Sequence, residues 1–378
     1  MPLPMETPTL PKFRIGMVIT SLSGSGAERV TLNLAEMFIQ HGHIVDLFLL
    51  ENTVQLTVSH SINIHFLTQN RRFYKWLGAL GDRLMANKLI ACIAKLNKTS
   101  PGSYDLFLSH LPAADKVVSL CRMPNAWYCI HTSYSGEISE FRRLKRGFRA
   151  FRKWRLYRSL YQDKNLVAVS LGVEGDLVKN LSIKPKNILT IYNPFQFDYL
   201  RKLASREINC FPGGDFIVHA GAFRPVKRHD LLLEAFALVK HDIKLVLLAN
   251  ECPELVGMVN RLGLEGKVLI FGHQDNPYPI LKAAKLMVLC SDREGLPTVI
   301  VESLILGTPV VSTDCPSGPA EILTGDLEEW LVPTNNPIAL AGKIDQALAA
   351  EINIRDSIIE KFSSDEAYTA YKNLIIKN

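Results

Sequence analysis

The chain has 378 residues, of which 47% are hydrophobic and 21% are charged, and its formal net charge at pH 7 is +6. This composition is that of a globular protein, and it excludes the intrinsically disordered and fibrous classes. Because a single hydrophobic core stops growing near ~250–300 residues, the length predicts two domains.

The charge is unevenly distributed along the chain. Residues 1–200 contain 25 Lys and Arg against 14 Asp and Glu, whereas residues 201–378 contain 18 against 23. A basic first half indicates a polyanionic partner or an anionic membrane surface. A charge difference of this size also arises by chance, so it does not by itself identify a partner.

Three observations concern the compartment. No run of about 18 uncharged apolar residues occurs, so we expect no membrane-spanning helix. Residues 1–12 include Glu6 and lack an apolar core, so we expect no secretory signal. The seven cysteines are scattered without a Cys-x-x-Cys pair, which is typical of a reducing compartment. A cytoplasmic location follows as the expectation.

Apolar runs alternate with amphipathic helical segments along the chain. In the first half the predicted strands are 13–20, 44–50, 106–109, 126–130 and 166–169, and the first helix is 27–41. In the second half the predicted strands are 215–220, 244–249, 268–271, 286–290 and 308–312, with helices at 229–240 and from about 297. This alternation predicts parallel sheets with helices on both faces, an α/β fold of two doubly wound units.

A polar segment with weak periodicity, between Tyr192 and Phe216, separates the two series. We therefore expect a Rossmann-like domain over residues 1–195, a linker over 196–214 and a second Rossmann-like domain over 215–354. Residues 355–378 are expected to form a helical tail that packs back on the first domain. Ligands of such folds bind at the carboxyl ends of the strands, so the cleft between the domains is the expected site.

A glycine-containing loop lies between the first predicted strand and its helix. Gly24 and Gly26 would let the backbone approach an anion at the helix N-terminus. The same loop also fits a plain tight turn. The third glycine of the dinucleotide-binding pattern is replaced by Arg29, which disfavours a pyridine-nucleotide oxidoreductase although Asp46 lies nearly where its acidic residue would.

A basic loop follows the first strand of the second half. Arg224 and Lys227 precede a helix there, and cations beside free N–H groups suit a diphosphate. Taken alone, the loop also fits a solvated basic turn.

Two glutamates bracket the start of a predicted helix. Glu294 lies in a loop beside Gly295, Pro297 suits the first helical position, and Glu302 follows on the helix. The rise of about 1.5 Å per helical residue places the two carboxylates on the order of 10 Å apart. That separation exceeds the ~5–9.5 Å of paired acid–base carboxylates. It suits two hydroxylated rings that flank a diphosphate.

In combination, these motifs resemble those of GT-B glycosyltransferases of the large retaining GT4 group. The second half carries the E-x7-E stretch, the E-G-L-P turn and G-T-P-V-V-S-T-D. The first half carries G-x-G-A-E-R from Gly24, a strand ending in His131-Thr132, Ser170 after a strand, and Asn193-Pro194 before the linker. The resemblance spans roughly residues 13–350, and it implies that the first domain binds the acceptor and the second the nucleotide-sugar.

The resemblance also implies roles for single residues. Lys227 would bind the donor diphosphate, Glu302 the ribose, and Glu294 the sugar, with His131 near the reacting face of that sugar. Because the family has Gly-Arg where this chain has Gly221-Ala222, Arg224 is expected to replace the missing arginine. The implied catalytic residues are His131 and Glu294. The implied donor-binding residues are Gly24, Gly26, Arg224, Lys227, Glu294, Gly295, Leu296, Pro297 and Glu302.

The expected chemistry follows from these assignments. The sequence contains no Asp-x-Asp motif, so we expect no metal clamp on the diphosphate and no cofactor besides the donor substrate. Residues 314–319 resemble family members that use UDP-sugars. The family is generally assigned a same-face mechanism, in which the leaving phosphate takes the proton of the acceptor. In such a mechanism His131 would position or polarise the substrate and would not act as a general base.

Residues 141–161 are strongly basic and contain no acidic residue. Aromatic and leucine side chains recur every three or four residues, which predicts one amphipathic helix for an anionic membrane surface. A core-packed helix and docking of an anionic acceptor are the alternatives, and no RNA-binding motif accompanies the charge. The basic residues are Arg142, Arg143, Lys145, Arg146, Arg149, Arg152, Lys153, Arg155 and Arg158.

The sequence thus predicts a cytoplasmic glycosyltransferase, peripheral on the inner face of the membrane. It would move a hexose or N-acetylhexosamine from UDP to a lipid-linked or lipopolysaccharide or polysaccharide-precursor acceptor, without nucleic acid as a partner. The alternatives are a non-catalytic sugar-nucleotide-binding or membrane-binding protein of the same fold and, with less support, a pyridine-nucleotide oxidoreductase.

Overall fold

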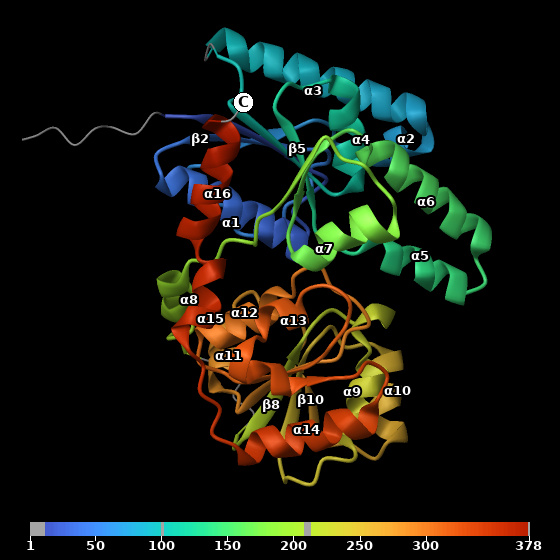
Figure 1. Ribbon diagram of the computed structural model, residues 1–378, viewed down its shortest axis with the longest axis vertical. Coiled ribbons are helices and arrows are strands. Elements are labelled where there is room, and N and C mark those ends of the chain that lie inside the picture. Colours follow the sequence, from blue (N-terminus) through green and yellow to red (C-terminus); the bar gives the residue numbers. More distant parts are fainter. Residues whose placement is uncertain (1–11, 100–101, 208–212, 377–378) are drawn as a thin grey trace, which may run out of the picture.

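The computed structural model describes residues 12–99, 102–207 and 213–376, which form two α/β domains, one above the other in Figure 1. The expectation about a secretory signal falls almost entirely on residues 1–11, which lie outside the described residues. Each domain is built on one parallel sheet, and we name the domains N-terminal and C-terminal by these sheets.

The N-terminal sheet has seven strands in the order β3-β2-β1-β4-β5-β6-β7. Its central strands carry uninterrupted apolar runs, because helices cover both faces of a parallel sheet. The strands are β1 (Arg14–Ile19), β2 (Ile44–Leu49), β3 (Asn63–Phe66), β4 (Leu106–His110), β5 (Ala126–Ile130), β6 (Asn165–Ala168) and β7 (Asn187–Thr190). The helices are α1 (Gly26–Gln40), α2 (Arg71–Trp76), α3 (Ala79–Thr99), α4 (Pro112–Cys121), α5 (Tyr134–Arg143), α6 (Gly147–Tyr161) and α7 (Leu171–Gly175), followed by the π-helical turn η1 (Asp176–Asn180).

The C-terminal sheet has six strands in the order β10-β9-β8-β11-β12-β13. The strands are β8 (Phe216–Ala220), β9 (Lys244–Leu248), β10 (Val268–Ile270), β11 (Leu286–Leu289), β12 (Val310–Thr313) and β13 (Leu331–Val332). The helices are α8 (Phe197–Leu203), α9 (His229–Phe236), α10 (Pro253–Arg261), α11 (Tyr278–Ala283), α12 (Thr298–Ile305), α13 (Pro319–Ile322), α14 (Pro337–Ala349), α15 (Asp356–Ile359) and α16 (Ser364–Ile376). The 3-10 turns are η2 (Pro225–Lys227), η3 (Gly325–Trp330) and η4 (Glu360–Phe362).

The order of strands reverses once in each sheet. In the N-terminal sheet β1 lies between β2 and β4, and in the C-terminal sheet β8 lies between β9 and β11. Such a switch point leaves a crevice at the carboxyl ends of the two flanking strands. The loops after β1, β4, β8 and β11 therefore form the floor of any site between the domains.

The segment expected to be a linker, residues 196–214, begins with helix α8. This helix packs against α11 and α12 of the C-terminal domain. At the other end of the chain, α16 returns to the N-terminal domain and lies beside α1 (Figure 1). There the ring of Tyr368 stacks on His41, with 3.5 Å between centroids, and its hydroxyl lies 2.9 Å from Nε2 of His43.

The prediction of one continuous basic helix over residues 141–161 is wrong. Helix α5 ends at Arg143, α6 begins at Gly147, and Lys145 between them has a left-handed φ of 55°. The predicted apolar stripe divides as well. Tyr157 is 1% exposed in the core, whereas Phe148 is 77% and Phe151 52% exposed.

Candidate active site

The loop between β11 and α12 carries a compact charged cluster. Nζ of Lys227 lies 2.6 Å from Oε1 of Glu294, and the hydroxyl of Ser291 donates to the same oxygen at 2.6 Å. Lys227 ends the turn η2 after β8, so two neighbouring strands of the C-terminal sheet supply the pair. The structure thus brings together two of the predicted donor residues, and it adds Ser291, which the sequence analysis did not single out.

Gly295 lies at a tight contact between the two domains. A Cβ atom there would be 2.0 Å from the carbonyl oxygen of His131, so no larger residue fits without displacing the backbone. The carbonyl of Gly295 accepts a hydrogen bond of 2.7 Å from the hydroxyl of Ser170. The main chain beside Glu294 therefore contacts the N-terminal domain at the predicted catalytic residue His131.

The residues that follow Gly295 open helix α12. Leu296 is 6% exposed and belongs to the core, so only its backbone is available to a ligand. Pro297 stands at the N-cap and not at the first helical position that the sequence predicts. The free N–H groups of the first turn of α12 are thereby presented at the carboxyl edge of the sheet.

Glu302 lies one to two turns further along α12. Burial raises its pKa to about 7, although nearby Arg29 and the hydroxyl of Tyr278 oppose this shift. The Tyr278 hydroxyl is 3.5 Å from Oε1 of Glu302. Arg29 comes from α1 of the N-terminal domain. In the sequence this arginine is only a departure from a glycine pattern, whereas in the structure its charge lies near Glu302.

The glycine loop between β1 and α1 is held by a buried carboxylate. Glu28 accepts hydrogen bonds from the hydroxyl of Ser21 at 2.8 Å and from the backbone N–H of Ser25 at 2.7 Å. Gly24 has a left-handed φ of 104°, and a Cβ at Gly24 or Gly26 would meet no atom within 4 Å. The loop thus has a fixed frame and an open face at the helix N-terminus.

The two arginines of the basic loop behave differently. Arg224 is exposed and forms no ion pair in the described part of the chain. Arg228 bonds to Asp230 at 3.0 Å and to Asp292 at 2.8 Å, and these hydrogen bonds raise its pKa. The two aspartates thus hold Arg228 in place, while Arg224 is available to a ligand.

Two histidines meet at the carboxyl edge of the N-terminal sheet. Nδ1 of His110, the last residue of β4, lies 3.0 Å from Nε2 of His131, which follows β5. Burial lowers the pKa of His131 to about 4, so its ring is neutral at physiological pH. The sequence analysis missed His110, because its place at the end of a predicted strand gave no sign of a partner 21 residues away.

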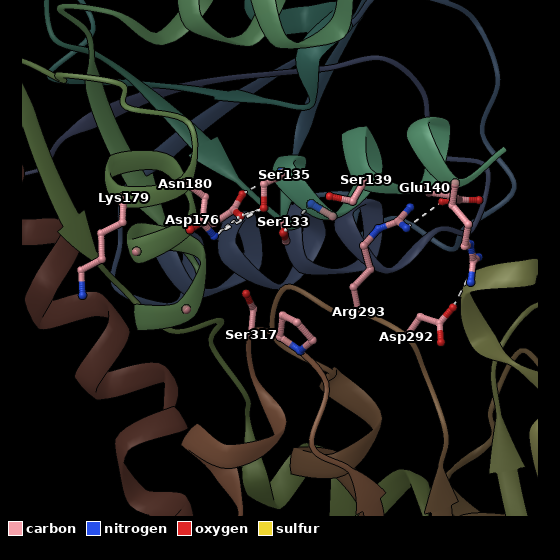
Figure 2. A pocket seen from close by; sticks show the side chains of 15 residues that line it. Ser133, Ser135, Ser139, Glu140, Asp176, Lys179, Asn180, Asp292, Arg293 and Ser317 are labelled. Atoms are coloured by element: carbon pink, nitrogen blue, oxygen red, sulfur yellow. Dashed lines mark hydrogen bonds and ion pairs between the residues drawn. The ribbon is translucent and has the colours of Figure 1, made fainter. Parts of the chain in front are cut away.

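A cavity of about 540 Å³, lined mainly by serine, glycine and charged residues, opens between the domains beside Asp292 and Arg293 (Figure 2). At one wall, Nη1 of Arg293 pairs with Oε2 of Glu140 on α5 at 2.7 Å. Nη2 of Arg143 lies 3.7 Å from Oδ2 of Asp292. On the opposite wall, the backbone N–H groups of Tyr134 and Ser135 donate to Asp176. Figure 2 also shows Ser139, Lys179, Asn180 and Ser317 around the cavity. The sequence analysis identified only Arg143 among its side chains.

The basic residues of 141–161 do not act as one surface. Lys153 pairs with Glu137 at 2.9 Å and donates to the hydroxyl of Tyr157, so it belongs to the packing of α5 against α6. Arg143 faces the C-terminal domain. In contrast, Arg149, Arg152 and Arg155 are exposed.

Two parallel-sheet domains that face each other through their carboxyl edges define the GT-B class of glycosyltransferases, and the predicted fold is confirmed. Residues 24–198 match the model of Glycosyltransferase Family 4, and residues 201–363 match that of glycosyl transferases group 1. The chain therefore belongs to these glycosyltransferase families and is an enzyme of this class. The alternative of a pyridine-nucleotide oxidoreductase is thereby set aside.

Relatives and solved structures agree with this assignment. The chain is 28% identical, over 85% of its length and 87% of the relative, to N-acetylgalactosamine-N,N'-diacetylbacillosaminyl-diphospho-undecaprenol 4-alpha-N-acetylgalactosaminyltransferase of Campylobacter jejuni. It is 25% identical, over 92% of both chains, to a second Campylobacter jejuni α-1,4-N-acetyl-D-galactosaminyltransferase, which acts on GalNAc-alpha-(1->4)-GalNAc-alpha-(1->3)-diNAcBac-PP-undecaprenol. Its fold matches Anabaena HepE in complex with UDP and glucose with a TM-score of 0.74, over 97% of this chain and 100% of that one, at 18% identity.

Proposed function

We propose that the protein is a retaining, metal-independent glycosyltransferase that moves a hexose or N-acetylhexosamine from a UDP-sugar to a lipid-linked or lipopolysaccharide or polysaccharide-precursor acceptor. The observation that carries the proposal is the cluster of Lys227, Glu294 and Ser291 at the carboxyl edge of the C-terminal sheet. This cluster precedes Glu302, a half-buried glutamate on α12, and it lies against the domain that carries His131.

The donor would occupy the edge of the C-terminal sheet. Lys227 and the first turn of α12 meet the diphosphate, and Glu294, released from Lys227, accepts hydrogen bonds from sugar hydroxyls. Glu302 accepts bonds from the ribose. Gly24 and Gly26 bring the N-terminus of α1 to the phosphates from the other domain, and the exposed Arg224 supplies a further cation.

The difficult part of the transfer is the charge that builds on the leaving UDP. Lys227 and two helix N-termini stabilise this charge without reorganisation, as preorganised donors do in other transferases. No step then requires a metal ion. His131 lies at the point where the two domains meet and would orient the sugar, while the leaving phosphate receives the proton of the acceptor hydroxyl.

The cavity of Figure 2 is the proposed place of the acceptor sugar. Its carboxylates are already compensated: Glu140 by Arg293, Asp292 by Arg228 and Asp176 by the amides of α5. What remains for a ligand is a wall of serine hydroxyls with one amide, Asn180, and one exposed cation, Lys179, which suits the hydroxyl groups of a sugar. The two Campylobacter relatives act on undecaprenol-linked glycans, which supports a lipid-linked acceptor.

The acceptor lipid would bring the enzyme to the inner face of the membrane as a peripheral protein. In the described ranges no helix has the length and apolarity needed to span a bilayer. Phe148 and Phe151 are exposed on α6 beside Arg149, Arg152 and Arg155, a combination that suits an anionic interface.

A transfer assay tests the proposal. Purified protein is incubated with each of a panel of UDP-hexoses and UDP-N-acetylhexosamines and with undecaprenyl-diphosphate-linked glycan, and the products are followed by mass spectrometry. One donor should give a product one sugar heavier, with the anomeric configuration of the donor in its NMR spectrum. An inverted product would contradict the retaining assignment, and UDP binding without any turnover would favour a non-catalytic protein.

Filling the cavity tests the acceptor site. Ser139 is exposed on the cavity wall, so Ser139→Trp should raise the KM for the acceptor at least tenfold and leave UDP affinity unchanged. Ser205→Trp, an exposed serine after α8, is the matched control and should change neither quantity. An unchanged acceptor KM in a folded Ser139→Trp protein would place the acceptor elsewhere.

A further inference from the structure

The two histidines at the carboxyl edge of the N-terminal sheet form a pair whose geometry restricts its chemistry. β4 and β5 are adjacent and parallel, and His110 is opposite Cys129 in their register. This register brings the ring of His110 to His131 with 5.3 Å between centroids at an angle of 31°. The rings are tilted, and the contact is a hydrogen bond of 3.0 Å between Nδ1 of His110 and Nε2 of His131.

The other nitrogen of His110 has no partner. His110 is 0% exposed, and its Nε2 forms no hydrogen bond within the described residues. Burial lowers the pKa of both rings, and for His110 the neighbouring His131 adds to the effect. The bond therefore joins two neutral imidazoles, one of which supplies an N–H and the other a lone pair.

The unpartnered Nε2 decides which ring donates. If His131 donated from Nε2, His110 would accept at Nδ1 and carry its proton on Nε2, which would leave an N–H buried without an acceptor. If His110 donates from Nδ1, its Nε2 keeps only a lone pair. Orphaned buried N–H groups are rarer in native proteins than under-used acceptors, so the second arrangement is favoured.

We propose that His110 is a positioning residue: it donates its Nδ1–H to His131 and thereby holds His131 in the Nδ1–H tautomer. His131 then has no free lone pair and serves the transfer as a hydrogen-bond donor, not as a general base. The inference deepens the proposed function and rests on it, because only a transferase gives His131 a reacting sugar. A donor at this place suits sugar hydroxyls or phosphate oxygens, while the acceptor proton leaves by another route.

The tautomer can be observed directly. The chain has 10 histidines, so selective 15N-histidine labelling and long-range 1H–15N correlation give a tractable spectrum, in which His131→Asn assigns the signals of His131. We expect the Nδ1–H tautomer for His131 in the unliganded wild-type protein. His110→Phe, which keeps the ring volume, should release His131 from this tautomer. His110→Asn, whose amide nitrogen replaces Nδ1, should keep it.

The kinetic consequence separates positioning from a merely structural role. His110→Phe should lower kcat on the order of tenfold, the loss expected for one misdirected hydrogen bond, with unchanged UDP affinity. His110→Asn should stay within a few-fold of wild type. An Nε2–H tautomer of His131 in the wild-type protein, or full turnover by His110→Phe, would overturn the proposal. Should His110→Phe not fold, the wild-type tautomer and His110→Asn still decide.

The same experiments distinguish this proposal from the proposed function. If the wild-type protein neither binds UDP nor consumes any UDP-sugar, the transferase assignment fails. The tautomer of His131 in the unliganded protein still reports on the His110 hydrogen bond in that case.

Discussion

The residues of the proposed donor site have neighbours of complementary polarity within the protein. Lys227 pairs with Glu294, while Glu302 is half-buried near Arg29 and Tyr278. Arg29 forms no ion pair with Glu302 in the described part of the chain, and a carboxylate withdrawn from water without a paired cation is costly, so such a residue is a candidate for ligand contacts. We therefore expect the carboxylate of Glu302 to favour ligand binding and to lower the stability of the fold.

Glu302→Gln should weaken UDP binding about tenfold or more at pH 8, because a neutral amide makes weaker hydrogen bonds to ribose hydroxyls than a carboxylate does. The pKa of Glu302 is about 7, so the wild-type side chain is itself largely neutral at pH 6, and the difference between the two proteins should shrink there. Calorimetric titration at both pH values measures it. Equal affinities at pH 8 in a folded variant would refute the ribose contact.

The same substitution should stabilise the protein. Because burial raises the pKa of Glu302 to about 7, the folded state binds more protons than the unfolded state between the ordinary pKa near 4.5 and 7. The unfolding free energy contributed by this group is therefore highest below pH 4.5 and falls as the pH rises to 7. Glu302→Gln should raise the unfolding free energy at pH 8 by on the order of 1–3 kcal/mol relative to wild type. A destabilised variant in denaturant titrations at pH 8 would show that the carboxylate is better solvated than the structure indicates.

At the scale of elements, local sequence predicted the central strands well and the edges poorly. The ten predicted strands occur within one or two residues of their bounds, because most residues of each are apolar. Three of the four edge strands were missed: β3 and β7 include polar residues and β13 has only two residues, whereas the fourth edge strand, β10, was predicted from its apolar run. The break between α5 and α6 was missed because helical spacing of the aromatic residues continues through it, while Lys145 adopts a left-handed turn.

The exposed part of α6 should bind anionic membranes. Reversing Arg149, Arg152 and Arg155 to Glu should abolish binding to anionic vesicles in a flotation assay and spare UDP affinity. Wild-type binding should fall steeply as salt shortens the Debye length from ~10 Å at 0.1 M to ~3 Å at 1 M. Lys153 is left in place, because its ion pair with Glu137 supports the fold.

A matched control keeps the same change of charge. Lys240, Arg261 and Lys267 are exposed on the C-terminal domain, and their reversal to Glu should leave vesicle binding intact. Equal losses in both triple variants would mean that net charge, and not α6, governs binding. Normal vesicle binding with failed transfer in the α6 variant would assign these charges to the acceptor.

At the scale of the whole molecule, the site depends on contacts that no local pattern predicts. Glu321 of the C-terminal domain accepts hydrogen bonds of 2.7 Å from the backbone N–H groups of Leu171 and Gly172, which open α7 in the N-terminal domain. Arg293 reaches Glu140 across the same interface. The motifs around Glu294 and Lys227 were recognisable from sequence, but these pairs are separated by about 150 residues and required the fold.

Glu321→Ala should loosen the closed arrangement of the domains. The variant removes the carboxylate from the N-terminus of α7, where a negative charge is favourable. Small-angle scattering should show a larger radius of gyration without ligand, and kcat should fall several-fold while each domain stays folded. Glu328→Ala, a solvent-facing residue of η3, is the control. An unchanged radius and rate would mean that the other contacts hold the domains alone.

The transfer should also persist in excess EDTA. Lys227 and the helix N-termini stabilise the leaving diphosphate in our account, and the sequence has no Asp-x-Asp motif to hold a metal there. Rates measured by UDP release with and without EDTA should agree. Complete loss of activity that Mn²⁺ or Mg²⁺ restores would contradict this part of the donor model.

The central claim is that Lys227, Glu294 and Glu302 form a nucleotide-sugar site, and calorimetric titration with UDP tests it most directly. The wild-type protein should bind UDP and not NAD, and Lys227→Ala should weaken UDP binding at least tenfold. Lys267→Ala, an exposed lysine before β10 at the opposite edge of the same sheet, should bind UDP like wild type. Equal UDP affinity in the wild-type and Lys227→Ala proteins, or no UDP binding by folded wild-type protein, would contradict the account.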